Sequence, residues 1–110
     1  MHQANATLNF LSTAVFKIPN AAGFLWEHMD DAHIIYDTRS GHSQALNDFA
    51  REIFDIIEDK PRSLPEILVA LELILERPIE DDLKQQILKT VTEFDKMGLI
   101  EPVNLHNENI

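Results

Sequence analysis

Two histidines flank an acidic pair, and imidazole and carboxylate groups are side chains that bind zinc. His28 and His33 lie on either side of Asp30-Asp31. If that pair forms a two-residue turn, the histidines become neighbours across a hairpin, with the carboxylates close by. The sequence contains no His-x-x-x-His or His-Glu-x-x-His spacing. We therefore favour a solvated hairpin over a metal site, and we expect neither a metal nor a cofactor.

Adjacent aspartates occur twice, but their spacing does not suit acid–base catalysis. The side chains of Asp30-Asp31 and Asp81-Asp82 diverge in a strand and do not face each other in a helix. A helix start explains the second pair better, because carboxylates stabilise the N-terminal end of a helix. There is no glycine-rich phosphate loop, no Gly-x-Ser-x-Gly motif and no cysteine. We expect a protein that is not an enzyme.

The charge of the chain restricts its partners. Its 110 residues suffice for one domain, and its net charge is −10. Such a surface repels nucleic acid and anionic lipid, and no stretch approaches the roughly 20 apolar residues that span a bilayer. We expect a partner of basic character, no nucleic acid and no membrane. The absence of cysteine fits a reducing compartment, so we expect a cytoplasmic protein.

Apolar residues in the second half of the chain recur at helical spacing and predict three helices. The inner face of the first comprises Leu46, Phe49, Ala50, Ile53, Phe54 and Ile57; that of the second Leu64, Ile67, Leu68, Leu71 and Leu75; and that of the third Leu83, Ile87, Val91 and Phe94.

Capping signals set the ends of these helices. Asn47 is a good N-cap for the first. Ser63 and Glu66 have the spacing of a capping box at the start of the second. The third is expected over about Asp81 to Met97, and Gly98 suits the left-handed residue that follows a helix end.

Three short strands are predicted before the helices, over Phe24–Met29, Ala32–Asp37 and His42–Leu46. We expect a three-residue loop, Arg39–Gly41, between the second and third strands, with Gly41 at positive φ. This loop pairs Ile34 with Leu46, Tyr36 with Gln44 and Ile35 with Ala45. Trp26 and Ile35 would then lie on the outer face of the sheet, where they need cover.

The predicted order is a three-stranded antiparallel sheet followed by three helices, an α+β fold of winged helix-turn-helix type. We divide the chain into residues 1–22, which form an N-terminal arm or an extra cover segment, a domain over 23–101, and a C-terminal tail over 102–110.

Several short motifs resemble the PqqD family. They are His33-Ile34-Ile35-Tyr36-Asp37, Ser40-Gly41, Ala45-Leu46-Asn47, Ala50 with Ile53, and the closing Met97-Gly98-Leu99-Ile100. The nearest subgroup is the one associated with an HPr kinase-related protein. Its usual Ser-Gly-Asp-Thr-His is replaced here by Ser40-Gly41-His42-Ser43-Gln44.

The resemblance implies a peptide chaperone, or recognition element, for ribosomally made precursor peptides. Such domains hold the leader segment and present the peptide to a modifying enzyme, which in the PqqD pathway is a radical S-adenosylmethionine protein. Leaders bind along the third strand, in the groove against the third helix. The corresponding positions here are His42, Ser43, Gln44, Ala45, Leu83, Lys84, Ile87, Leu88 and Val91. An edge strand offers unpaired backbone groups to an added strand, which independently favours this mode.

Two alternatives belong to other functional classes. A winged helix can bind nucleic acid, but residues 79–100 carry a net charge of −2, which disfavours phosphate contacts. A structural homodimer would use an exposed Trp26 as an interface anchor. We favour a core position for Trp26 and leave homodimer formation open.

Overall fold

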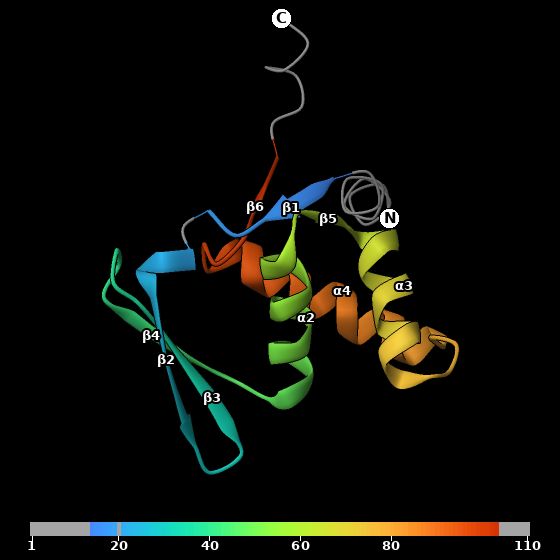
Figure 1. Ribbon diagram of the computed structural model, residues 1–110, viewed down its shortest axis with the longest axis horizontal. Helices are drawn as coiled ribbons and strands as arrows, with labels where there is room; N and C mark the ends of the chain where they lie inside the picture. Colours follow the sequence, from blue (N-terminus) through green and yellow to red (C-terminus); the bar gives the residue numbers. More distant parts are fainter. Residues whose placement is uncertain (1–13, 20, 104–110) are drawn as a thin grey trace, which may run out of the picture.

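The strands and helices follow the predicted order in the computed structural model, which describes residues 14–19 and 21–103 (Figure 1). A three-stranded antiparallel sheet precedes three helices, so the predicted fold class is confirmed. The sheet consists of β2 (Phe24–Met29), β3 (Ala32–Asp37) and β4 (His42–Leu46), in the spatial order β2-β3-β4. The helices are α2 (Asp48–Asp59), α3 (Leu64–Leu75) and α4 (Asp81–Lys96).

The hairpin between β2 and β3 has the predicted two-residue turn. Met29 pairs with Ala32 and His28 with His33, so Asp30-Asp31 forms the turn. Asp30 has a φ of 53°, a left-handed conformation that aspartate tolerates better than most residues.

The register between β3 and β4 differs from the prediction by one residue. Asp37 pairs with His42, which leaves a four-residue loop, Thr38–Gly41, rather than three. The amide of Gly41 donates to the carbonyl of Asp37 at 2.8 Å. Ile34 therefore pairs with Ala45, Ile35 with Gln44, Tyr36 with Ser43 and His33 with Leu46.

The predicted faces of the sheet were also wrong. Ile35 is 1% exposed and belongs to the core, and Trp26 is partly buried and packs against the core. Leu25 and Tyr36 are exposed instead. Because side chains alternate along a strand, choosing the wrong parity sends every residue to the opposite face.

A second small sheet joins the two ends of the described chain. It contains β1 (Val15–Lys17), β5 (Arg62–Ser63) and β6 (Glu101–Pro102), in the order β5-β1-β6. Phe16 of β1 is fully buried. A short 3₁₀ turn, η1 (Ala21–Gly23), leads from β1 to β2. The predicted arm and tail fall largely on residues 1–13, 20 and 104–110, which lie outside the described residues, so those assignments stay predictions.

The predicted caps are confirmed. The side chain of Asn47 accepts a hydrogen bond from the amide of Ala50 at 2.8 Å. Ser63 and Glu66 form both bonds of the capping box, at 2.8 and 3.3 Å. Gly98 has a φ of 75° after α4. Leu75 departs from the predicted inner stripe of α3, because it is 36% exposed at the end of the helix.

Phe54 of α2 connects the layers of the core. Its ring packs edge-to-face against Phe24 at 5.9 Å, Trp26 at 5.1 Å and Phe94 at 5.9 Å, measured between ring centroids. These contacts hold the sheet and α4 against α2, so the relative position of β4 and α4 depends on this cluster. No helix among the described residues is both long and apolar enough to cross a bilayer.

Candidate functional site

The exposed edge of β4 is the first part of the candidate site. Within the described chain β4 pairs only with β3, and His42, Ser43 and Ala45 are exposed, whereas Gln44 is partly buried. The amide of Thr38 donates to the carbonyl of Gly23 at 2.9 Å. This bond shows which residues of β3 exchange backbone hydrogen bonds with β2 and which with β4.

That alternation determines which backbone groups face outward. Even-numbered residues of β3 bond to β2, so the odd-numbered ones bond to β4. Gln44, the partner of Ile35, therefore directs its backbone inward. Ser43 and Ala45 direct their N–H and C=O groups toward the open edge, where an added strand would bond to them.

The turn before β4 is held by an ion pair. The guanidinium of Arg39 donates to both carboxylate oxygens of Asp37, at 3.1 and 3.0 Å, and the Arg39 amide donates to the same carboxylate at 2.9 Å. The Asp37 side chain is 8% exposed. Hydrogen bonding to Arg39 is the main cause that lowers the pKa of the Asp37 carboxyl, despite the opposing effect of desolvation.

Arg39 also connects this turn to the residue that follows α4. Its Nη2 donates to the carbonyl of Gly98 at 3.2 Å, and the guanidinium lies over the ring of Phe24, 5.4 Å from the centroid. One side chain thus contacts the β3–β4 turn, the first strand of the sheet and the exit of α4. The start of β4 is thereby fixed relative to the helix.

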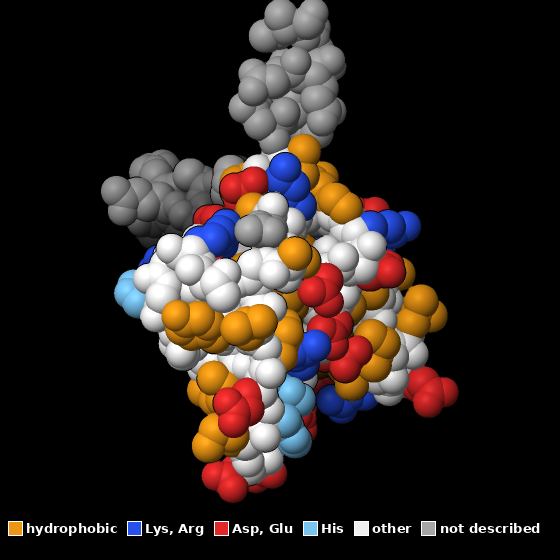
Figure 2. Space-filling model, turned by 60° about the vertical axis from the view of Figure 1, so that its left-hand side comes forward, with side chains coloured by type: hydrophobic (Ala, Val, Ile, Leu, Met, Phe, Trp, Pro, Cys, Tyr) orange, Lys and Arg blue, Asp and Glu red, His pale blue; other side chains and the backbone are white. Residues whose placement is uncertain are grey.

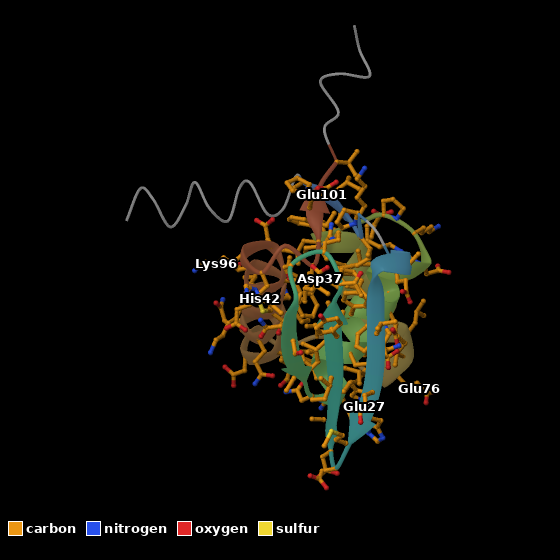
Figure 3. The ribbon with its side chains drawn as sticks, turned by 90° about the vertical axis from the view of Figure 1, so that its left-hand side faces the viewer. Glu27, Asp37, His42, Glu76, Lys96 and Glu101 are labelled. Carbon is orange, nitrogen blue, oxygen red and sulfur yellow. The ribbon has the colours of Figure 1, made fainter. Side chains whose placement is uncertain are left out.

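Helix α4 lies toward the β4 side of the sheet when the sheet faces the viewer (Figure 3). Of the predicted site residues on this helix, Leu83 and Leu88 are partly buried and Lys84 is exposed. Ile87 and Val91 are both 0% exposed and belong to the core. Leu83, Lys84 and Leu88 are therefore the predicted site residues of α4 that a ligand can reach. Ile87 and Val91 lie beneath them.

The two histidines of the first hairpin lie together, as predicted. Their rings are 4.7 Å apart between centroids, and Nε2 of His33 is 2.7 Å from Oδ1 of Asp48. Figure 2 shows neighbouring histidines in pale blue on the lower part of the molecule. Within residues 14–19 and 21–103, no cluster of three or more histidine, aspartate or glutamate side chains is arranged to hold a metal ion.

Arg51 was not identified from the sequence, although it shapes the cavity beside these histidines. Its guanidinium lies 3.5 Å from the centroid of the Trp26 ring and donates to Asp55 at 2.9 Å. The cavity has a volume of about 570 Å³. The Arg51–Asp55 spacing of four residues was a possible signal for the ion pair, but nothing local indicates the contact with Trp26.

The comparisons with known proteins address the fold. No family model matches the sequence, and no curated protein matches it. A solved structure described as TbiB1 in complex with the TbiA(beta) leader peptide matches with a TM-score of 0.59 and 17% identity, over 80% of this chain and 98% of that chain. At this identity the likeness concerns the fold alone. The chain therefore has the same fold as TbiB1, which agrees with the broad PqqD-like fold expected from the sequence and leaves the subgroup a prediction.

Proposed function

We propose that this protein binds the leader segment of a ribosomally made precursor peptide, which is added as a fourth strand at β4, and presents the peptide to a modifying enzyme. The observation that carries the proposal is the outward-facing backbone of Ser43 and Ala45 on an edge strand, on the side of the sheet where α4 lies (Figure 3). The shared fold with a protein solved in complex with a leader peptide supports it.

Backbone pairing alone would not give useful affinity. Ser43 and Ala45 offer about four hydrogen-bonding groups at the open edge. At about 0.5–1.5 kcal/mol net for each bond, they contribute about 2–6 kcal/mol. Micromolar binding requires about 8 kcal/mol, and ordering the peptide adds a further cost.

Apolar contacts with α4 would therefore have to supply the rest. Leu83 and Leu88 are partly buried side chains that pack against the core, and Ile87 and Val91 lie beneath them. One or two leader side chains buried here would add about 1.5–3 kcal/mol each. His42 and Gln44 complete the proposed contacts along the strand, and Lys84, which is exposed, would meet a carboxylate of the leader.

The net charge of −10 favours a leader or an enzyme surface with basic residues elsewhere. We infer that raising the salt concentration weakens the complex, because long-range attraction is screened. A radical S-adenosylmethionine enzyme is the modifying partner that the family resemblance suggests.

The test uses synthetic peptides from short open reading frames next to the gene. We expect binding of a cognate leader to change amide chemical shifts at residues 42–46 and 83–91. Changes confined to residues 49–57 would contradict the groove assignment.

A proline substitution tests strand addition directly. Ala45→Pro removes an outward N–H without removing a bond to β3, so we expect leader affinity to fall at least tenfold with the fold retained. His28→Pro is the matched control, because the same alternation directs the His28 backbone outward on the opposite edge strand, β2. Equal loss of affinity in both variants would contradict binding at β4.

A further inference from the structure

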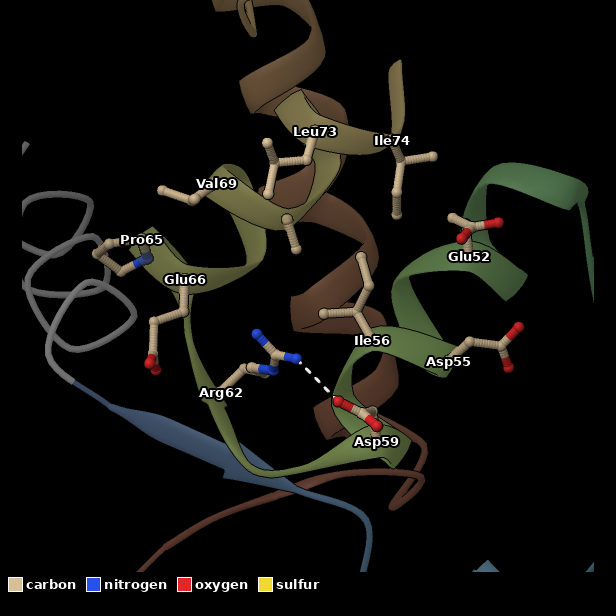
Figure 4. Close-up of a pocket in the computed structure, with 11 residues that line it drawn as sticks. Glu52, Asp55, Ile56, Asp59, Arg62, Pro65, Glu66, Val69, Leu73 and Ile74 are labelled. Carbon is tan, nitrogen blue, oxygen red and sulfur yellow. Dashed lines mark hydrogen bonds and ion pairs between the residues drawn. The ribbon is translucent and has the colours of Figure 1, made fainter. Parts of the chain in front are cut away.

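An open groove runs between α2 and α3. Its volume is about 680 Å³. Ile56 of α2 lies between the helices, with Val69, Leu73 and Ile74 along α3 (Figure 4). The groove is lined by residues other than those of the β4 edge, so the proposed function does not account for it.

Helix α3 has more apolar surface than the core can cover. Every residue of this 12-residue helix except Glu66 and Glu72 is apolar. One face is buried, but Leu73 is 75% exposed and Val69 is 56% exposed. A surface helix normally presents polar residues to water, and a contiguous exposed apolar patch marks an interaction site.

The rim of the groove on α2 is acidic. Glu52, Asp55 and Asp59 follow each other along α2 at spacings of three and four residues, which places them on one face of the helix over about 10 Å. Asp55 is paired with Arg51 at 2.9 Å, and Asp59 with Arg62 at 3.0 Å. No ion pair involving Glu52 is found among the described residues.

The charge of the lining remains negative after these pairs are counted. The lining residues Glu52, Asp55, Asp59 and Glu66 carry four negative charges and Arg62 one positive charge, a net −3. Adding Arg51 from the adjacent ion pair leaves −2. The apolar side chains of α3 and Ile56 therefore lie beside an acidic rim on α2, where the Glu52 and Asp55 side chains lie on the side of the helix away from α3 (Figure 4).

We propose that this groove binds an amphipathic helix of a partner protein, with apolar residues at i, i+3 or i+4 and i+7 against α3, and lysine or arginine residues against α2. Charge complementarity selects this occupant. A second copy of the chain would bring the same acidic wall against itself and would be repelled, whereas a basic helix is attracted.

The groove and the β4 edge lie on different sides of the molecule. In Figure 3, β4 and α4 lie to one side, and α2 and α3 lie to the other. A leader peptide at β4 and a helix in the groove would not compete for space. The protein would thus bind two chains at once, and this inference can fail without affecting the proposal for β4.

The probe for this groove is a fluorescein-labelled 14-residue peptide of leucine and lysine arranged with helical periodicity. We expect saturable binding in fluorescence anisotropy. Leu73→Ser should weaken it about tenfold, because it removes a leucine that the bound peptide would bury. Glu52→Lys should weaken it several-fold at low salt and less at high salt. The same peptide with glutamate in place of lysine should not bind.

Matched controls separate this site from general attraction to an acidic protein. Leu25→Ser removes an apolar side chain that is 58% exposed on the sheet, and Glu58→Lys changes an exposed acidic residue of α2 that does not line the groove. Both should keep affinity within twofold. Equal losses in test and control variants, or equal binding of the glutamate peptide, would overturn the proposal.

Two further measurements exclude the other occupants. Ala45→Pro should leave binding of the leucine–lysine peptide unchanged, and loss of binding would place that peptide at β4 instead. Sedimentation velocity should show a monomer for the wild type. A dimer that dissociates in Leu73→Ser would assign the groove to self-association and overturn the proposal.

Discussion

Replacing Phe54 with alanine should destabilise the protein more than most single substitutions. Its side chain is 0% exposed and contacts Phe24, Trp26 and Phe94. Phe→Ala in a core costs about 3–5 kcal/mol, from lost burial and from the cavity that remains. Each edge-to-face contact accounts for about 0.5–1.5 kcal/mol of that loss. Domains of this size have about 5–15 kcal/mol of stability in total, so the loss is a large fraction.

The assay is urea unfolding, monitored by circular dichroism and by the fluorescence of Trp26, the only tryptophan in the sequence. With a slope of about 1.5 kcal/mol per molar urea, a loss of 4 kcal/mol lowers the midpoint by about 2–3 M. Phe54→Leu retains apolar volume and should lose only about 1–2 kcal/mol. If Phe54→Ala cannot be purified folded, Phe54→Leu provides the measurement.

Val69→Ala on α3 is the control, because Val69 is 56% exposed and surface substitutions usually change stability by about 0.5 kcal/mol or less. A loss below 1 kcal/mol for Phe54→Ala would refute the view that this ring joins the sheet to the helices. It would also mean that the aromatic cluster does not set the position of the sheet relative to α4.

Three further predictions concern individual contacts. Arg39 lowers the pKa of Asp37 in the folded state. The stability that Asp37 contributes is therefore present above its unfolded pKa and is lost as the pH falls through its folded pKa. Urea midpoints measured between pH 6 and pH 2 should fall less steeply for Asp37→Asn than for the wild type, and parallel curves would contradict this. Ser63→Ala removes the N-cap of α3 and should cost about 1 kcal/mol in urea unfolding, whereas Ser43→Ala, at an exposed position of β4, serves as the control. Arg51→Gln removes the cation from the Trp26 ring and should cost about 0.5–2 kcal/mol while shifting the emission of Trp26; an unchanged spectrum would show that the two side chains are apart in solution.

Local signals in the sequence were sufficient for the helices. Asn47, Ser63 and Gly98 each act within three or four residues of the chain, so their types and positions predict the caps directly. The register at β4 depended on the length of the loop before it. Either three or four residues of the segment Thr38–Gly41 can form this loop, and the hydrogen bonds from Arg39 to Asp37 stabilise the four-residue form.

Contacts between distant parts of the chain leave no signal in the local sequence. Nothing near Val15–Lys17 indicates that this strand pairs with Ser63 and Pro102. The edge position of β4 followed from the strand order, whereas the positions on α4 came from the family resemblance. Helical periodicity had already placed Ile87 and Val91 on the inner face, and both are buried. The groove beside α3 was missed, although the apolar composition of that helix was visible in the sequence.

The pairing of β1 has a consequence for synthesis on the ribosome. Phe16 pairs with Pro102, so β1 emerges from the exit tunnel long before its last partner has been translated, 86 residues later (102 − 16). The sheet of β2, β3 and β4 is local and closes early, because short loops cost little entropy and local contacts form fast. Phe16, fully buried in the folded domain, therefore cannot be completely covered until β6 has been translated. Nascent chains arrested before residue 100 should expose β1 to a chaperone that recognises apolar segments, and chains extended past β6 should not.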